Sequence, residues 1–115
     1  MDKEKILAEI DDIALLEENW DGYGADPISD KIIAKAREVV DGFDNKYDDP
    51  SVVPSVLGIQ FEWNHGDNGI EVYVEDDGEL SCLRVDGPDF ENWVEAKLCN
   101  IVEINKLLKW LYGKG

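Results

Sequence analysis

The sequence predicts an α+β fold, with two N-terminal helices, an antiparallel meander sheet of three to four strands, and a C-terminal helix packed on one face of the sheet. Apolar residues recur every third or fourth position up to residue 43 and again after residue 96, whereas they alternate between residues 58 and 85. A chain of 115 residues, 43% of them hydrophobic, fits one domain spanning 1–115. Within it we expect a helical hairpin over about 3–42, a loop over 44–55, the sheet over about 56–94 and the last helix over about 96–112.

The first helix is expected over about 3–18. Its apolar positions are spaced by three and four residues: Ile6, Leu7, Ile10 and Ile13. A second helix begins after Ser29, a favourable N-cap residue, and ends near Asp41 and Gly42. Ile28 precedes the cap and is placed to contact Ile33 in the first turn.

Between these helices lies the stretch ENWDGYGADPIS, residues 18–29. Gly22 and Gly24 permit positive φ on both sides of Tyr23, the Asp21 side chain can bond forward to the backbone, and Trp20 can fold back over the helix pair. These properties favour a structural corner, with a binding loop as the alternative. A phosphate cradle is disfavoured because carboxylates surround the glycines.

Residues 44–55 contain two prolines and several turn formers, which predicts a connecting loop with at most a short extended piece. In the strands that follow, Trp63 facing Ile70 would leave Glu62 opposite Glu71. A two-residue turn at Asp77 and Gly78 before a strand over 80–85 would then set Glu71 opposite Arg84. We therefore expect a surface row of Glu62, Glu71 and Arg84, and an edge strand over 90–94.

Cys82 and Cys99 are 17 residues apart and form no CxxC pair. Since the N-terminus has no apolar signal-peptide core and no stretch approaches 18 apolar residues, we expect a cytoplasmic protein. In a reducing compartment we expect the two cysteines to be free, buried and small hydrophobic residues, with a disulfide between them as the less favoured alternative.

The charge balance is the unusual feature of the composition. The chain has 27 Asp and Glu against 11 Lys and Arg, a formal net charge of -16. Direct binding to nucleic acid or to an anionic membrane is disfavoured, because clusters of cations are missing. We expect a basic protein or complex as partner. Eleven acids fall within residues 62–95 beside Arg84 alone, so the expected partner-binding residues are Glu62, Glu71, Glu75, Asp76, Asp77 and Glu79.

Enzyme and metal chemistry find little support in the residues. One histidine and two separated cysteines do not make a zinc site, and we expect no metal, no cofactor and no catalytic residue. Residues 64–75 match part of a calcium-binding loop, but Gly66 occupies a ligand position and the flanking residues are strand-like. His65 is expected to be a polar turn residue.

The stretch ENWDGYGADPIS, followed by PSVLGIQFEW at residues 54–63, resembles a pattern found in small proteins of bacteria and their phages. The similarity covers about two thirds of the chain. Its residues are Trp20, Asp21, Gly22, Gly24, Ala25, Pro27, Pro54, Gly58 and Trp63. It carries no established activity and implies a phage or mobile-element setting.

The leading hypothesis is a non-enzymatic acidic protein that presents carboxylates to a basic surface in imitation of phosphates, as an anti-CRISPR or anti-restriction inhibitor would. An antitoxin, or an accessory subunit that oligomerises through exposed Trp110, Leu111 and Tyr112, is an alternative. A small hydrolase that uses Glu62 and Glu71 as paired carboxylates is another.

Overall fold

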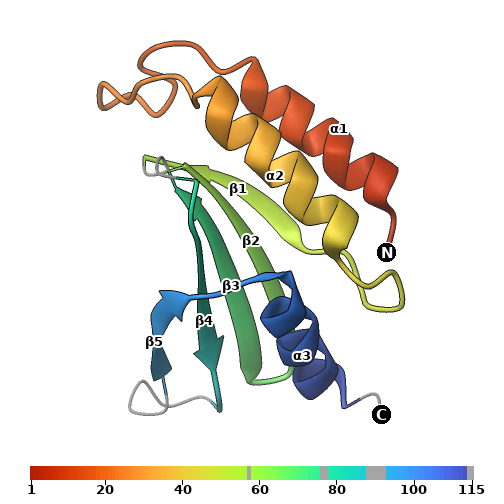
Figure 1. Ribbon diagram of the computed structural model, residues 1–115. Helices are drawn as coiled ribbons and strands as arrows, with labels where there is room; N and C mark the ends of the chain where they lie inside the picture. Colours follow the sequence, from red (N-terminus) through yellow and green to blue (C-terminus); the bar gives the residue numbers. More distant parts are fainter. Residues whose placement is uncertain (57, 76–77, 88–92, 114–115) are drawn as a thin grey trace.

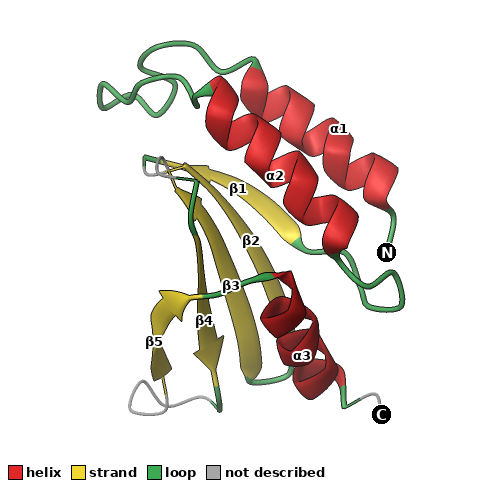
Figure 2. Ribbon diagram, viewed as in Figure 1, coloured by secondary structure: helices red, strands yellow, loops and turns green. Residues whose placement is uncertain are grey.

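The expected α+β fold is confirmed by a computed structural model, which describes residues 1–56, 58–75, 78–87 and 93–113 (Figures 1 and 2). The elements in chain order are α1 (Lys3–Ala14), α2 (Asp30–Gly42), β1 (Ser51–Ser55), β2 (Gly58–His65), β3 (Asn68–Glu75), β4 (Leu80–Val85), β5 (Trp93–Leu98) and α3 (Ile101–Tyr112). The strands form one antiparallel sheet in the order β1-β2-β3-β4-β5.

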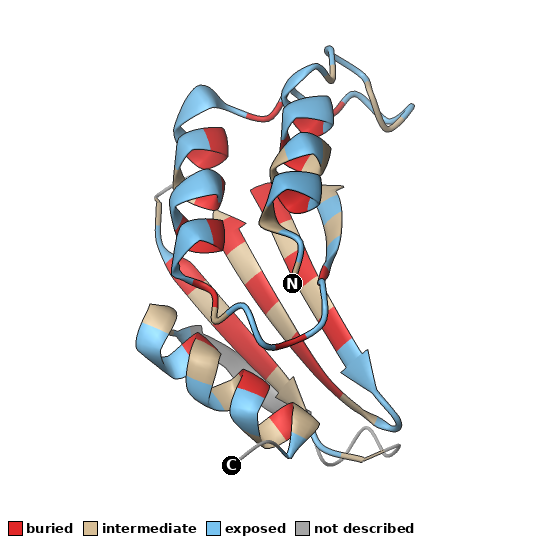
Figure 3. Ribbon diagram, turned by 90° about the vertical axis from the view of Figure 1, so that its right-hand side faces the viewer, coloured by how far each residue is buried: buried red, intermediate tan, exposed pale blue. Residues whose placement is uncertain are grey.

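The three helices of the described residues lie on the same face of the sheet (Figure 3). The core forms between them and alternate strand residues, because successive side chains of a strand point to opposite faces. Its largest fully buried members include Trp63, Phe61, Ile70, Ile10, Ile32, Ile104 and Leu108. The Phe43 ring packs edge-on against Phe61 and Trp63, with centroid distances of 5.3 and 5.1 Å. The opposite face of the sheet, called here the outer face, is left without a helix by the described residues.

The helices agree with the expected positions except at two ends. α2 is capped as expected, with the Ser29 hydroxyl accepting a hydrogen bond from the Ile32 amide at 3.2 Å. α1 ends at Ala14 rather than near residue 18, because the Leu15 and Leu16 amides bond three residues back and Asn19 takes a φ of 65°. α3 begins at Ile101 rather than at 96, where the Asn100 side chain accepts a hydrogen bond from the Glu103 amide at 3.0 Å.

The sheet has five strands, more than the three to four expected. The last five residues of the expected 44–55 loop form β1, which tolerates Pro54 because an edge strand pairs on one side only. The expected edge strand over 90–94 is β5 at Trp93–Leu98, which extends into residues that the sequence pattern assigned to the last helix; residues 88–92 lie outside the described ranges.

The β2–β3 register is as expected. Trp63 pairs with Ile70, and Glu62 pairs with Glu71. The expected β3–β4 register is wrong by one residue. Three residues rather than two separate Glu75 from Glu79, and the Gly78 amide donates to the Glu75 carbonyl at 2.8 Å. Gly78 has a φ of 76°, which suits the last position of a three-residue hairpin loop.

A slip of one residue moves every side chain of a strand to the other face. Glu71 therefore pairs with Leu83, and Arg84 pairs with Ile70 on the face that the helices cover. The expected surface row of Glu62, Glu71 and Arg84 is wrong for its third member.

The expectation of two free thiols is also wrong, because Cys82 and Cys99 form a disulfide with a Cα–Cα distance of 6.0 Å. The pairing of β4 with β5 carries Cys99 back beside β4, where its amide donates to the Leu80 carbonyl at 2.9 Å. Disulfides are typical of oxidising surroundings, whereas the expectation assumed a reducing compartment. Among the described helices, none has the length and apolar character needed to cross a bilayer.

Candidate functional site

The outer face brings together four of the six residues expected to bind a partner. Strand alternation and register put Glu62, Glu71, Glu75 and Glu79 on this face. The other two, Asp76 and Asp77, lie outside the described residues. The remaining outer-face side chains of β1 to β4 are neutral: Ser51, Val53, Ser55, Gln60, Asn64, Tyr73, Ser81, Leu83 and Val85. Within these described strands, the outer face therefore carries carboxylates and no lysine or arginine.

The centre of this face is held by hydrogen bonds between side chains. The Gln60 amide nitrogen donates to Glu62 Oε1 and, at 3.4 Å, to Glu71 Oε1. The Tyr73 hydroxyl donates to Glu71 Oε2. Burial raises the pKa of the Tyr73 phenol, and the hydrogen bond to Glu71 and the charges of Glu71 and Glu62 raise it further, so the phenol stays protonated as a donor. The two facing carboxylates are thus oriented by neutral donors rather than by a cation.

The Arg84 side chain lies on the opposite, helix-covered side of the sheet. Its guanidinium carbon lies 3.9 Å from the centroid of the Trp110 ring in α3, and its Nη2 lies 3.1 Å from an Asp86 carboxylate oxygen. The sequence alone assigned this cation to the outer face, where it would have relieved the Glu62–Glu71 repulsion. Its absence from that face makes the patch more negative than the sequence suggested.

The loop between α1 and α2 satisfies its own backbone. Asp21 accepts from the Tyr23 and Ala25 amides at 2.8 and 3.1 Å, and the Asn19 side chain accepts from the Gly24 amide at 2.7 Å. The Trp20 indole packs against the core and donates to the Asp26 carbonyl at 2.8 Å. Gly22 and Gly24 have the positive φ expected of them.

At the tip of this loop, the Tyr23 side chain is 93% exposed. The geometry is that of a tight corner that projects one aromatic ring into solvent. A binding role for this loop stays a prediction.

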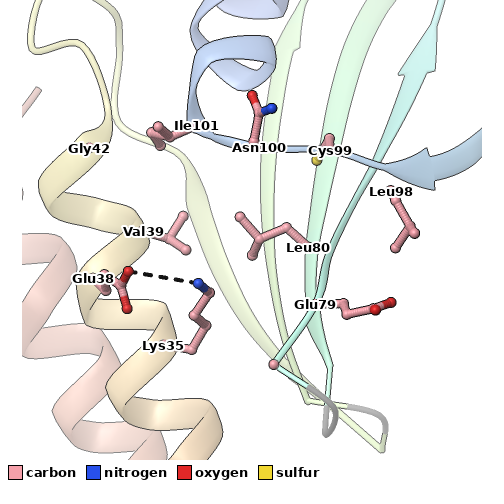
Figure 4. Close-up of a pocket in the computed structure, with 11 residues that line it drawn as sticks. Lys35, Glu38, Val39, Gly42, Glu79, Leu80, Leu98, Cys99, Asn100 and Ile101 are labelled. Carbon is pink, nitrogen blue, oxygen red and sulfur yellow. Dashed lines mark ion pairs between the residues drawn. The ribbon is translucent and has the colours of Figure 1, made fainter.

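A groove of about 500 Å³ opens between α2 and the segment that joins β5 to α3 (Figure 4). Val39 of α2, Leu80 of β4 and Ile101 of α3 form much of its apolar lining, and Cys99 of the disulfide borders it. At its α2 wall Lys35 pairs with Glu38 at 3.7 Å. This groove could not be predicted from the sequence, because its walls come from segments far apart in the chain.

His65 lies at the end of β2 in a second hollow, of about 390 Å³, lined by Lys46, Tyr47, Asp48, His65 and Tyr112. The Tyr47 and Tyr112 rings stack with centroids 5.7 Å apart, and the His65 ring lies 5.0 Å from that of Tyr112. The structure therefore gives His65 aromatic neighbours that its position in the sequence did not predict.

The C-terminal residues proposed as an oligomer contact are not all at the surface. Leu111 is 3% exposed and belongs to the core, while Trp110 and Tyr112 are partly buried against it. These side chains are covered because the C-terminal end of α3 packs onto β3 and β2. The expectation that all three side chains are exposed is wrong.

Comparison with protein-family models, with curated proteins and with solved structures found no match to this chain. Among the described residues, no three or more His, Cys, Asp or Glu side chains are grouped so that they could hold a metal ion. The assignment of function therefore depends on the geometry and charge of the chain itself.

Proposed function

We propose that this protein is a non-enzymatic binding protein whose outer face docks on a basic surface of another protein. The observation that carries the proposal is the set of four glutamates on the sheet face that no described helix covers, with no lysine or arginine among the described side chains of β1 to β4 on that face. A surface of one sign steers a partner of the opposite sign and forms charge-assisted hydrogen bonds with its Lys and Arg side chains.

The distribution of the cations supports the same proposal. Most described lysines and arginines are on the helical layer: Lys3, Lys5, Lys31, Lys35, Arg37, Lys106 and Lys109. Several of these cations are already engaged: Arg37 pairs with Asp11, Lys35 pairs with Glu38, and Lys3 Nζ donates to the Asp41 carbonyl at 2.9 Å. The helices thus mix cations with carboxylates, whereas the described strands β1 to β4 offer only carboxylates on the outer face.

The concrete form of the proposal is an inhibitor that occupies the nucleic-acid site of a defence complex, of anti-CRISPR or anti-restriction type. Regularly spaced carboxylates can replace phosphates as ligands of a nucleic-acid-binding surface. The resemblance of the ENWDGYGADP and PSVLGIQFEW stretches to proteins of bacteria and phages is consistent with that setting.

The test begins with capture of partners from a host lysate at low salt and elution at high salt, and continues with the purified captured protein. Binding is then compared between two variants that remove the same charge. One replaces the outer-face acids, Glu62, Glu71, Glu75 and Glu79, with glutamine. The other replaces helical acids, Glu4, Glu9, Glu38 and Glu103, with glutamine.

We expect the outer-face variant to lose most binding and the helical variant to keep it, with wild-type affinity falling steeply as NaCl rises. The captured protein should also release a fluorescent DNA duplex when the wild-type protein is added. Equal loss in both variants would mean that net charge alone attracts the partner. Unchanged binding of the outer-face variant would overturn the proposal.

A further inference from the structure

A third hollow, of about 280 Å³, lies on the outer face beside Gly58. Its lining residues are Ser55, Val56, Ile59, Gln60, Tyr73, Val74 and Glu75. Gly58 is the Cα partner of both Ser55 and Glu75, and it contributes no side chain to the face between them. The hollow therefore lies beside a position where the outer face has no side chain.

Position 58 must be glycine for a reason that belongs to the fold. Its φ is 152°, and a Cβ built there would lie 1.9 Å from the Val74 carbonyl oxygen. The Ser55 hydroxyl accepts a hydrogen bond from the Gly58 amide at 3.1 Å and so fixes the neighbouring strand. The lack of a side chain between Ser55 and Glu75 is thus a permanent feature of the β1–β2–β3 arrangement.

The groups around this gap match one kind of side chain. Tyr73 offers an aromatic ring, and Glu75, two residues further along β3, offers a carboxylate. The Gln60 amide nitrogen points at Glu62 and Glu71, so the carbonyl oxygen of the same group points away from them and can accept a hydrogen bond. A planar cation with several donors can stack on the ring and bond to both acceptors, which a guanidinium does better than an ammonium.

We propose that the hollow beside Gly58 is a socket for an arginine side chain of the partner, with the guanidinium stacked on Tyr73 and paired with Glu75. This inference rests on the proposed function and deepens it, since it selects arginine rather than lysine as the anchor. Glu62 and Glu71 then supply the surrounding negative potential. The hydrogen bond from Tyr73 to Glu71 holds the ring in place without occupying its face.

The direct test is titration of ¹⁵N-labelled protein with N-acetyl-arginine amide and, separately, N-acetyl-lysine amide at low salt. Both carry one positive charge. We expect the arginine compound to shift the amide signals of Gly58, Gln60, Tyr73 and Glu75, and the lysine compound to bind about three- to fivefold more weakly. Equal affinity for the two, or arginine-induced shifts confined to other acidic sites, would overturn the socket.

Variants separate the ring from its hydroxyl. Tyr73→Phe keeps the ring and should keep the preference for arginine, whereas Tyr73→Leu should abolish it. Glu75→Gln should weaken arginine binding, while the helical control Glu103→Gln should not. The wild-type titration decides the proposal even if the leucine variant fails to fold.

The outcome is distinguishable from that of the proposed function. If arginine fills the hollow but the four-glutamine outer-face variant still binds the captured partner, the socket stands and the docking proposal fails. If that variant loses the partner while arginine and lysine compounds bind alike, the docking proposal stands and the socket fails.

Discussion

At the scale of single residues, the outer face is shaped by one glycine. Gly58 combines a φ of 152° with a contact that leaves no room for a methyl group, and its Cα partners are Ser55 and Glu75. Side chains rarely adopt this φ, and the obstacle is backbone rather than a movable side chain. The same residue therefore limits what the fold tolerates and leaves the outer face without a side chain beside the hollow at Tyr73.

We predict that Gly58→Ala lowers the free energy of unfolding by about 3 kcal/mol or more, because strain and a steric clash act together. Gly66→Ala is the matched control. Gly66 also has a positive φ, 62°, but no atom lies within 4 Å of a built Cβ, and its cost should be about 1 kcal/mol. Urea unfolding measures both. Similar losses for the two variants would contradict the role given to the Val74 carbonyl.

At the scale of elements, the disulfide joins β4 to the segment that leads into α3. We predict that replacing both cysteines with serine lowers the free energy of unfolding by about 3 kcal/mol, the value typical of a loop of this length. Urea unfolding with and without dithiothreitol measures it: the reductant should destabilise the wild type and leave the double variant unchanged. A wild type insensitive to the reductant would contradict the contribution of this bond.

The position of Arg84 on the helix-covered face can be tested through its contact with Trp110. With Arg84 on the helix-covered face, Arg84→Gln removes a cation–π contact between β4 and α3 and should cost about 1 kcal/mol. Lys106→Gln, at an exposed position of α3, should change the free energy of unfolding by less than about 0.5 kcal/mol. Had Arg84 been on the outer face, both substitutions would have had similarly small effects in urea unfolding.

The sequence predicts a structural feature when neighbouring residues determine it, and fails when distant segments do. The Ser29 cap and the pairing of Trp63 with Ile70 follow from neighbouring residues, and both are confirmed. The β3–β4 register turned on whether two or three residues form one hairpin loop, a difference that residues 76–79 do not specify. The Cys82–Cys99 bond and the hollow beside Gly58 need three-dimensional pairing of strands. The acidic composition was visible, but the placement of four glutamates on one sheet face was not.

At the scale of the whole molecule, the net charge of -16 has two opposite consequences. Neighbouring carboxylates would attract the proposed basic partner from a distance, and the same carboxylates repel one another in the folded state. Glu62 and Glu71 are direct cross-strand partners with no cation beside them among the described side chains of β1 to β4, and they are the clearest case of this repulsion. A protein that keeps these carboxylates for binding should therefore be less stable than a variant with a neutral outer face.

This trade-off predicts how salt changes the stability of the protein, and the prediction distinguishes an outer face that serves binding from acids that only aid solubility. Raising NaCl from about 10 mM to 500 mM should raise the urea midpoint of the wild type, because salt screens the repulsion between carboxylates. The variant with glutamine at Glu62, Glu71, Glu75 and Glu79 should have a higher midpoint at low salt and a smaller response to salt. The variant with glutamine at Glu4, Glu9, Glu38 and Glu103 should gain less, since Glu38 pairs with Lys35 and the helices carry most of the described cations. If both variants gained equally, the repulsion would be spread over the molecule, and the outer face would have no special electrostatic character.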